Sequence, residues 1–295
     1  MNITGKIGGR LTVGVVAKKY TPEILRITSK IYNLLEDRVE KLLVEERLAS
    51  LLNISNGVSL REIYADVDTL IIVGGDGSFL RTVFEMPYSS NKKFLGVKVA
   101  TSLGFLMSSD ELHLEDDLKS FIQGNYWLEK RSRLELFIPS TEKKLYFLNE
   151  IVVRSGDFQS LVSLEVVDLE TGEKIYKGKC DGLILSTTTG ASAYAFSLNR
   201  VVVDYRLDVL YVLPIAPLSV LSLPIVMPSK SRLKVKIKSA PGGVSVVGDG
   251  FHTILLKQGE IGSLYVGRGD EINLVRFRSD FYRRIRERVL YGWQS

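Results

Sequence analysis

The chain has 295 residues, 45% of them hydrophobic and 25% charged, which is typical of a globular protein of one or two domains and favours two. Its formal charge of +5 suits a phosphorylated ligand, but no block of like charge indicates a nucleic-acid partner. One cysteine, Cys180, and two histidines exclude an internal disulfide and supply little for a zinc centre or a Ser–His–Asp site, so no protein-held metal site is predicted.

The first third of the chain alternates patterns of strand and helix. Thr21 and Pro22 predict an N-cap and a first helical residue for a helix that ends near Leu35. Strands are predicted at 11–17, 42–44, 69–73 and 94–99, and further helices at 78–86 and 111–124. This alternation predicts a parallel sheet with helices on its faces.

The remainder of the chain has short β-type runs separated by turn residues. Strands are predicted at 133–138, 145–148, 164–167, 233–237 and 272–277, with a hairpin turn at 170–173 and a terminal helix at 280–290. We therefore predict an α/β Rossmann-like domain (1–110), an antiparallel β domain (111–279) and a C-terminal helix (280–295) that packs back on the first domain.

Nothing in the chain predicts a membrane segment. The N-terminal residues have no apolar core of the signal-peptide kind. The uncharged run 209–228 has the length of a membrane span but contains four prolines, each of which removes a backbone donor. We expect a cytoplasmic protein that binds neither membrane nor nucleic acid.

A glycine-rich turn, Gly74-Gly75-Asp76-Gly77-Ser78, follows the strand 69–73 and precedes a helix. Glycines let a backbone approach a ligand closely, and a helix N-terminus presents free amides, so a phosphate is the expected ligand. An aspartate among such amides is unfavourable unless it serves chemistry or magnesium. The Walker pattern is absent, and the third glycine of the dinucleotide fingerprint would fall on Leu80.

A second motif runs from Asp181-Gly-Leu to Tyr194. A strand at 183–185 is followed by four consecutive hydroxyl residues, Ser186 to Thr189, then Gly190 and a helix predicted from about Ala191. The hydroxyls can donate to phosphate or ribose oxygens, or they can cap the helix. Tyr194 offers a flat face for stacking on a base, or it is an ordinary core aromatic.

These motifs, with Asn149-Glu150 between them, make the chain resemble the NAD kinase family. Looser matches are Leu103-Gly-Phe-Leu106 and Pro214-Ile-Ala-Pro217 followed by Asp249-Gly250. The chain departs from the family pattern at Thr188, Ala191, Ser192 and Phe251, and in the segment 96–102. Diacylglycerol and sphingosine kinases share the glycine turn but not the second motif.

The resemblance implies that the chain uses ATP or another phosphoryl donor, with Mg²⁺, to phosphorylate NAD at its adenosine 2′-hydroxyl. It implies that Asp76 is catalytic and faces that hydroxyl, and that the protein is a homodimer or homotetramer. Binding residues implied for NAD or the phosphates are Gly75, Gly77, Arg81, Asn149, Glu150, Lys179, Asp181, Thr189, Ser192, Ala193, Tyr194 and Ser197. Two alternatives are a lipid kinase of the diacylglycerol type and a non-catalytic dinucleotide sensor.

Overall fold

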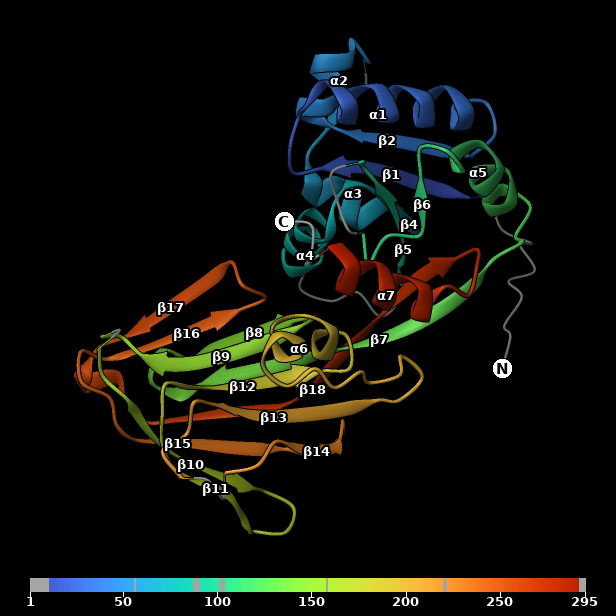
Figure 1. Cartoon of the computed structure of the whole chain (residues 1–295). Coiled ribbons are helices and arrows are strands. Elements are labelled where there is room, and N and C mark those ends of the chain that lie inside the picture. The colour runs from blue at the N-terminus through green and yellow to red at the C-terminus, as the bar shows by residue number, and fades with distance from the viewer. Residues whose placement is uncertain are drawn as a thin grey trace. The chain divides into compact units, whose positions relative to one another are not determined.

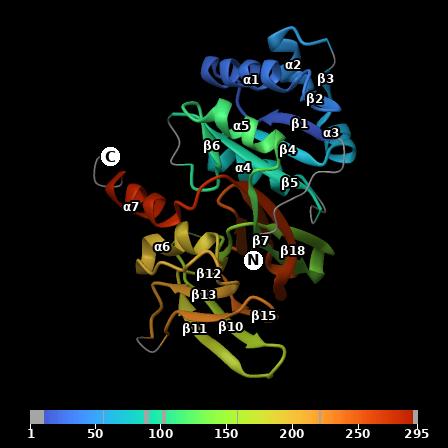
Figure 2. The same cartoon turned by 90° about the vertical axis from the view of Figure 1, so that its right-hand side faces the viewer.

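The computed structural model describes residues 11–291 except 56, 87–90, 101–103, 158, 220 and 221, so Leu103 and part of the segment 96–102 lie outside the described residues. The chain forms two compact units (Figures 1 and 2). The first unit comprises Met1–Lys130 and Ile272–Ser295, and the second unit is Arg131–Glu271.

The first unit is built on a parallel sheet. Its strand order is β3 (Gly57–Val58), β2 (Lys41–Glu45), β1 (Thr12–Ala17), β4 (Thr69–Gly74) and β5 (Lys93–Lys98). The short β6 (Ser109–Asp110) and the end of β18 (Ser263–Arg276) also pair with β5 in parallel. The central strands are buried on both sides, which explains their continuous apolar sequence.

Helices cover both faces of this sheet, as Figure 1 shows. On one face, α1 (Pro22–Leu35), α2 (Glu46–Leu52) and α5 (Leu114–Ile122) share a core with residues of β1, β4 and β5. On the other face, α3 (Leu60–Asp66) brings Ile63 against Gly14, and α4 (Asp76–Phe84) places the Phe79 ring 6.0 Å from that of Phe94. Thr21 caps α1 by accepting a hydrogen bond from the Ile24 amide, as predicted.

The first unit extends beyond the expected boundary at residue 110. Helix α5 buries Leu114, Leu118 and Phe121 in the core of the first unit, and the division falls at Lys130. The chain returns to this unit at Ile272, through the end of β18 and α7 (Phe281–Tyr291). The Phe281 ring packs edge-on against Phe105, so α7 packs on the first unit.

The second unit consists of antiparallel β-structure. One sheet has six strands in the order β14 (Ile225–Pro228), β13 (Val209–Ile215), β12 (Gly182–Thr187), β9 (Glu150–Ser155), β16 (Val244–Gly248) and β17 (His252–Leu256). The other strands are β11 (Lys174–Cys180), β10 (Val162–Asp168), β15 (Leu233–Ser239) and β18, with β7 (Trp127–Ile138) and β8 (Lys143–Phe147) beyond β18. The α/β plus antiparallel β fold class predicted from the sequence is confirmed.

The six-stranded sheet carries the short helix α6 (Tyr194–Asn199) on one face. Ala191 and Ala195 pack there against Val152, Ile184 and Tyr211. The proline-containing run 209–228 supplies the two strands β13 and β14. Within the described part of the chain, no helix has the length and apolar character needed to cross a membrane.

Candidate functional site

The glycine turn connects β4 to α4 in the first unit. Gly74 ends β4 at φ 152°, a conformation that favours glycine, and an added Cβ would lie 2.7 Å from the Ser78 Oγ. Gly75 is the N-cap of α4. Gly77 is exposed inside the first helical turn, and an added Cβ would meet nothing within 4 Å. Because its own surroundings do not require glycine, the open space over Gly77 suits a ligand that approaches the backbone.

The first turn of α4 presents backbone donors. The Ser78 and Phe79 amides donate to the Gly75 carbonyl at 2.9 and 3.0 Å, which closes the turn. The amides of the residues before them lie at the helix start, where no preceding turn supplies an acceptor. Together with the positive end of the helix dipole, these amides are donors of the kind that an anion such as phosphate accepts. Arg81 is exposed one turn further along α4.

The Asp76 carboxylate does more than the sequence predicted. Its Oδ2 accepts a hydrogen bond from the Phe105 amide at 2.9 Å, and its Oδ1 accepts one from the Leu106 amide at 2.8 Å. Helix α4 begins at Asp76, two residues before the predicted start, so this half-buried side chain projects from the helix end. Each carboxylate oxygen keeps a further lone pair that can accept a hydroxyl proton.

The segment that Asp76 binds is also held from its carbonyl side. The Arg276 guanidinium donates to the carbonyls of Leu106 and Met107, the latter at 2.7 Å. Arg284 on α7 donates to the Phe105 carbonyl at 3.0 Å and is itself paired with Asp280. The residues 104–107 are therefore fixed by an anion at their amides and by cations at their carbonyls. No sequence pattern indicated this arrangement.

In the second unit, two motif segments meet at Asn149 and Glu150. The Asn149 carbonyl accepts hydrogen bonds from the Thr187 amide at 2.9 Å and the Ser186 hydroxyl at 3.3 Å. Glu150, buried at the start of β9, lies opposite Ser186 of β12 in the strand register. The sequence motifs 149–150 and 186–190 are thus adjacent in space.

Gly190 makes this approach possible. An added Cβ would lie 2.2 Å from the Asn149 carbonyl oxygen and 2.5 Å from the Ser186 Oγ, closer than real contacts allow. The Gly190 amide donates to the Thr187 Oγ1 at 3.1 Å, and that hydroxyl donates to the Leu148 carbonyl at 2.6 Å. The glycine of the second motif therefore serves packing against the Asn149 backbone.

The hydroxyl run of the second motif bonds mainly to backbone. Thr188 donates to the Leu207 carbonyl at 2.6 Å and accepts from the Val209 amide, so the residue that replaces the family's proline fastens the end of β12. Ser192 donates to the carbonyl of Thr189, and both residues are buried. For Ser186, Thr187, Thr188 and Ser192, these contacts favour the structural interpretation over direct ligand binding.

Asp249 completes the cluster and was not among the predicted site residues. Its carboxylate accepts hydrogen bonds from the amides of Leu148 at 2.9 Å, Asn149 at 2.7 Å and Glu150 at 3.2 Å. Asp249 and Gly250 have φ values of 49° and 73°, which turn the chain back under that segment. Burial raises the pKa of Asp249 to about 6, because its effect exceeds that of the three amide hydrogen bonds, which lower the pKa. The only available indication in the sequence was the Asp249-Gly250 pair.

The remaining predicted residues of the second unit fall into two places. Tyr194 begins α6 with 37% of its surface exposed, Ala193 precedes it, and Ser197 is exposed on the same helix. Lys179 and Asp181 are exposed just before β12, whereas the Asn149 cluster lies at the other end of that six-residue strand. The structure therefore groups Asn149, Glu150, Thr189 and Ser192, and separates Lys179 and Asp181 from them by about 17 Å of strand.

Comparison with known proteins identifies relatives of the whole chain. Residues 148–277 match the model of the ATP-NAD kinase C-terminal domain. An NAD kinase of Thermococcus kodakarensis is 31% identical over 91% of this chain and 95% of its own length. An NAD kinase of Moorella thermoacetica is 30% identical over 95% of this chain and 89% of its own length. Among solved structures, yeast NADH kinase complexed with NADH has a TM-score of 0.85 at 23% identity, over 98% of this chain and 89% of that one. An NAD kinase of Archaeoglobus fulgidus in complex with ATP has a TM-score of 0.71 at 23% identity, over 96% of this chain and 98% of that one.

A glycine-rich turn that opens a helix of an α/β unit is typical of proteins that bind phosphorylated ligands. The extent of the match to the relatives then decides the family. The chain belongs to the NAD kinase family.

Proposed function

We propose that this protein transfers the terminal phosphoryl group of ATP to the adenosine 2′-hydroxyl of NAD and so produces NADP and ADP. The observation that carries the proposal is the family membership, established at 31% identity over 91% of the chain. In the reaction, a bond forms between the 2′-oxygen and the γ-phosphorus, the bond from that phosphorus to the β,γ-bridging oxygen breaks, and the hydroxyl proton is released.

Asp76 is the proposed acceptor of that proton. Phosphoryl transfer passes through a loose transition state, in which alignment and charge neutralisation contribute more than early proton removal. The two amide hydrogen bonds of Asp76 hold its carboxylate in one orientation, so its remaining lone pairs have a defined direction. We infer that it orients the 2′-hydroxyl and takes the proton late. Gly75, Asp76 and Gly77 are proposed to bind phosphate oxygens through their backbone amides, whereas the amides of Ser78 and Phe79 already donate to the Gly75 carbonyl.

The proposed NAD contacts in the second unit are Asn149, Glu150, Thr189, Ala193, Tyr194 and Ser197, with Lys179 and Asp181 toward the nicotinamide end. Ser192, whose hydroxyl donates to the Thr189 carbonyl, keeps the structural role described above. Asn149 and Glu150 combine donor and acceptor groups of the kind that bind ribose hydroxyls. Tyr194 has the exposed ring surface that stacking on a base requires.

Magnesium is proposed as part of the donor substrate, held by phosphate oxygens. Within the described residues, no three His, Cys, Asp or Glu side chains gather in a group that could hold a metal ion. Mg²⁺ commonly keeps several waters and binds substrate phosphates, where it neutralises charge. Chelation with EDTA should abolish turnover, and added Mg²⁺ should restore it.

The direct test incubates the protein with NAD, ATP and Mg²⁺ and detects NADP with an NADP-specific dehydrogenase. Phosphorus NMR of the product then establishes that the 2′ position carries the phosphate. Parallel incubations with diacylglycerol and with NAD alone are the controls. Phosphorylation of the lipid instead of NAD, or binding of NAD without any turnover, would contradict the proposal.

A further inference from the structure

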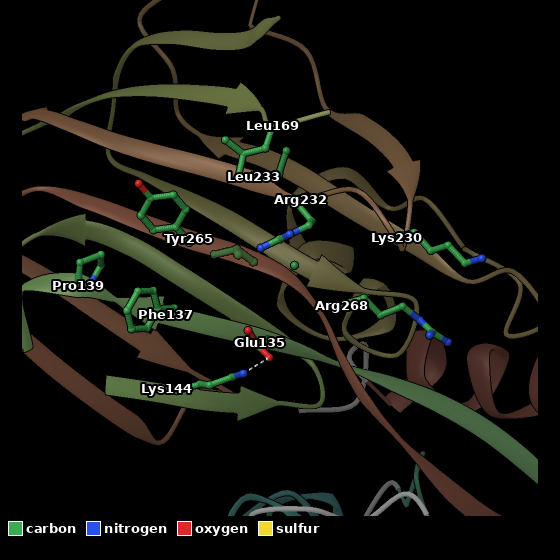
Figure 3. Close-up of a pocket in the computed structure, with 12 residues that line it drawn as sticks. Glu135, Phe137, Pro139, Lys144, Leu169, Lys230, Arg232, Leu233, Tyr265 and Arg268 are labelled. Atoms are coloured by element: carbon green, nitrogen blue, oxygen red, sulfur yellow. Dashed lines mark ion pairs between the residues drawn. The ribbon is translucent and has the colours of Figure 1, made fainter. Parts of the chain in front are cut away.

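The second unit contains a cavity of about 750 Å³ on its β7–β8–β15–β18 side, which Figure 3 shows in close-up. None of the residues predicted from the sequence for NAD or phosphate binding lines it. Its volume lies in the range of pockets that accept small organic ligands. The cavity therefore requires an explanation that is independent of the proposed kinase site.

The floor of the cavity depends on a strand residue without a side chain. Gly267 of β18 lines the cavity, and the stem of Arg232 lies across it, with the Arg232 Cγ 3.5 Å from an added Cβ. Glycine inside a strand weakens the strand and often marks a close approach by a ligand. Here it leaves the guanidinium of Arg232 lying over the sheet surface, as Figure 3 shows.

One wall of the cavity is aromatic. The rings of Phe137 and Tyr265, on β7 and β18, have centroids 6.3 Å apart and an interplanar angle of 40°. Phe137 is 37% exposed and Tyr265 is half-buried, so both rings present surface to the cavity. Such surface favours contact with a flat ring.

The lining also carries an excess of positive charge. Four cations (Lys144, Lys230, Arg232 and Arg268) line the cavity together with one carboxylate, Glu135, a net charge of 4 − 1 = +3. Lys144 pairs with Glu135 at 2.9 Å, and Arg268 pairs with Asp208 at 3.2 Å. Within the described part of the chain, neither Lys230 nor Arg232 has an acidic partner. These two cations are therefore available to an anionic ligand.

We propose that this cavity is a second ligand site, separate from the kinase site, for a small organic phosphate that carries a flat ring, of the nucleotide class. Arg232 and Lys230 bind the phosphate, and Phe137 and Tyr265 contact the ring. A planar guanidinium matches a phosphate group geometrically, and contact of the ligand ring with the aromatic wall supplies the apolar part of the affinity.

A site-resolved experiment tests the proposal on the whole protein. Pyridoxal 5′-phosphate combines a flat ring with a phosphate, and its aldehyde condenses with a lysine amine to an imine and water. Borohydride then reduces the imine, and mass spectrometry locates the modified lysine. Propionaldehyde, which has neither ring nor phosphate, corrects for intrinsic reactivity. For each lysine, the rate of modification by pyridoxal 5′-phosphate is divided by the rate of modification by propionaldehyde. We expect this ratio to be about tenfold higher at Lys230 than at the exposed Lys177 on β11, because one charge-assisted contact provides about that factor.

Variants and competitors separate the two parts of the proposal. Arg232→Glu and Tyr265→Ala should each abolish the preference for Lys230 over Lys177. Arg61→Glu, at an exposed arginine on α3 of the first unit, should leave that preference intact. ADP should protect Lys230 more strongly than inorganic phosphate does. Equal modification of Lys230 and Lys177 in the unaltered protein would overturn the proposal, and equal protection by phosphate and ADP would overturn the part that concerns the ring. Because the position of the label is measured, the result does not depend on NAD kinase activity.

Discussion

At the scale of single residues, Asp76 combines a structural contact with its proposed role in the reaction. Asn offers one acceptor oxygen and places an NH₂ group where the second oxygen stood, so it would face either the Phe105 or the Leu106 amide as donor to donor. The Asp76→Asn change is therefore not neutral for the fold, contrary to what its similar shape suggests. We expect a loss of about 1–3 kcal/mol in the free energy of unfolding and a fall in turnover of roughly 10²–10⁴-fold.

Two measurements separate the loss of stability in Asp76→Asn from the loss of catalysis. Turnover is measured well below the melting temperature, and hydrogen exchange is measured at the Phe105 and Leu106 amides. Asp68→Asn is the matched control, because that exposed carboxylate accepts a hydrogen bond from the Thr12 hydroxyl away from the glycine turn. Near-normal turnover in a folded Asp76→Asn protein would end the catalytic assignment and leave Asp76 as the anchor of residues 104–107.

Asp249 predicts a pH dependence of stability. Burial raises its pKa from 3.8 to about 6 in the folded protein, so the folded state binds a proton that the unfolded state releases. Its contribution to the free energy of unfolding is fully present below about pH 4 and is lost as the pH rises through about 6. Relative to Asp249→Asn, the unaltered protein should lose about 1–3 kcal/mol between pH 4 and pH 7. Denaturant unfolding at several pH values measures this difference, and parallel pH curves for the two proteins would contradict it.

Tyr194 is the residue through which base stacking is tested. Tyr194→Ala should weaken NAD binding by about 1–3 kcal/mol, whereas Tyr194→Phe keeps the ring and should be much milder. Titration calorimetry measures the affinities, and thermal melting measures stability. Unchanged NAD affinity in the alanine variant, with stability reduced in both, would show that the tyrosine serves only packing.

At the scale of secondary-structure elements, the ends of β9, β12 and β16 are packed together around Asn149. Gly190→Ala places a Cβ against the carbonyl oxygen of Asn149, which belongs to the rigid backbone. The substitution should therefore lower the free energy of unfolding by about 1–3 kcal/mol. It should also weaken NAD binding, because it displaces Asn149 and Glu150. Gly262→Ala is the control, since an added Cβ there meets nothing within 4 Å. Chemical denaturation and NAD titration of both variants measure the effects. Equal stability of the two variants would show that the segment 186–190 moves away at little cost.

At the scale of the whole molecule, we expect a homodimer or homotetramer. The two edge strands of the six-stranded sheet, β14 and β17, expose Val226 (54%) and Leu255 (68%), and the nearby Leu223 is 67% exposed. Exposed apolar residues on edge strands favour association with another chain. Light scattering at micromolar concentration measures the mass, and a monomer of 33.0 kDa would contradict the expectation.

The class of fold and the family could be predicted from the amino-acid sequence. Long apolar strands and well-capped helices such as α1 follow local patterns, because their side-chain periodicity and caps act within a few residues. The helices α2 and α3 were not predicted, because each has only seven residues and depends on packing against the sheet. The glycine turn was recognisable because three glycines and an aspartate stand together between a strand and a helix, although only Gly74 has a backbone conformation that favours glycine.

What those residues contact depends on the tertiary fold. Asp76 reaches amides 29 and 30 residues away, and Asp249 reaches amides 99 to 101 residues away, distances at which no local pattern in a single sequence operates. The same holds for the hydroxyl run, where Thr187 and Thr188 bond to backbone carbonyls rather than remaining available to a ligand. Hydrogen bonds require atoms within about 3 Å, and only the folded chain brings these atoms that close.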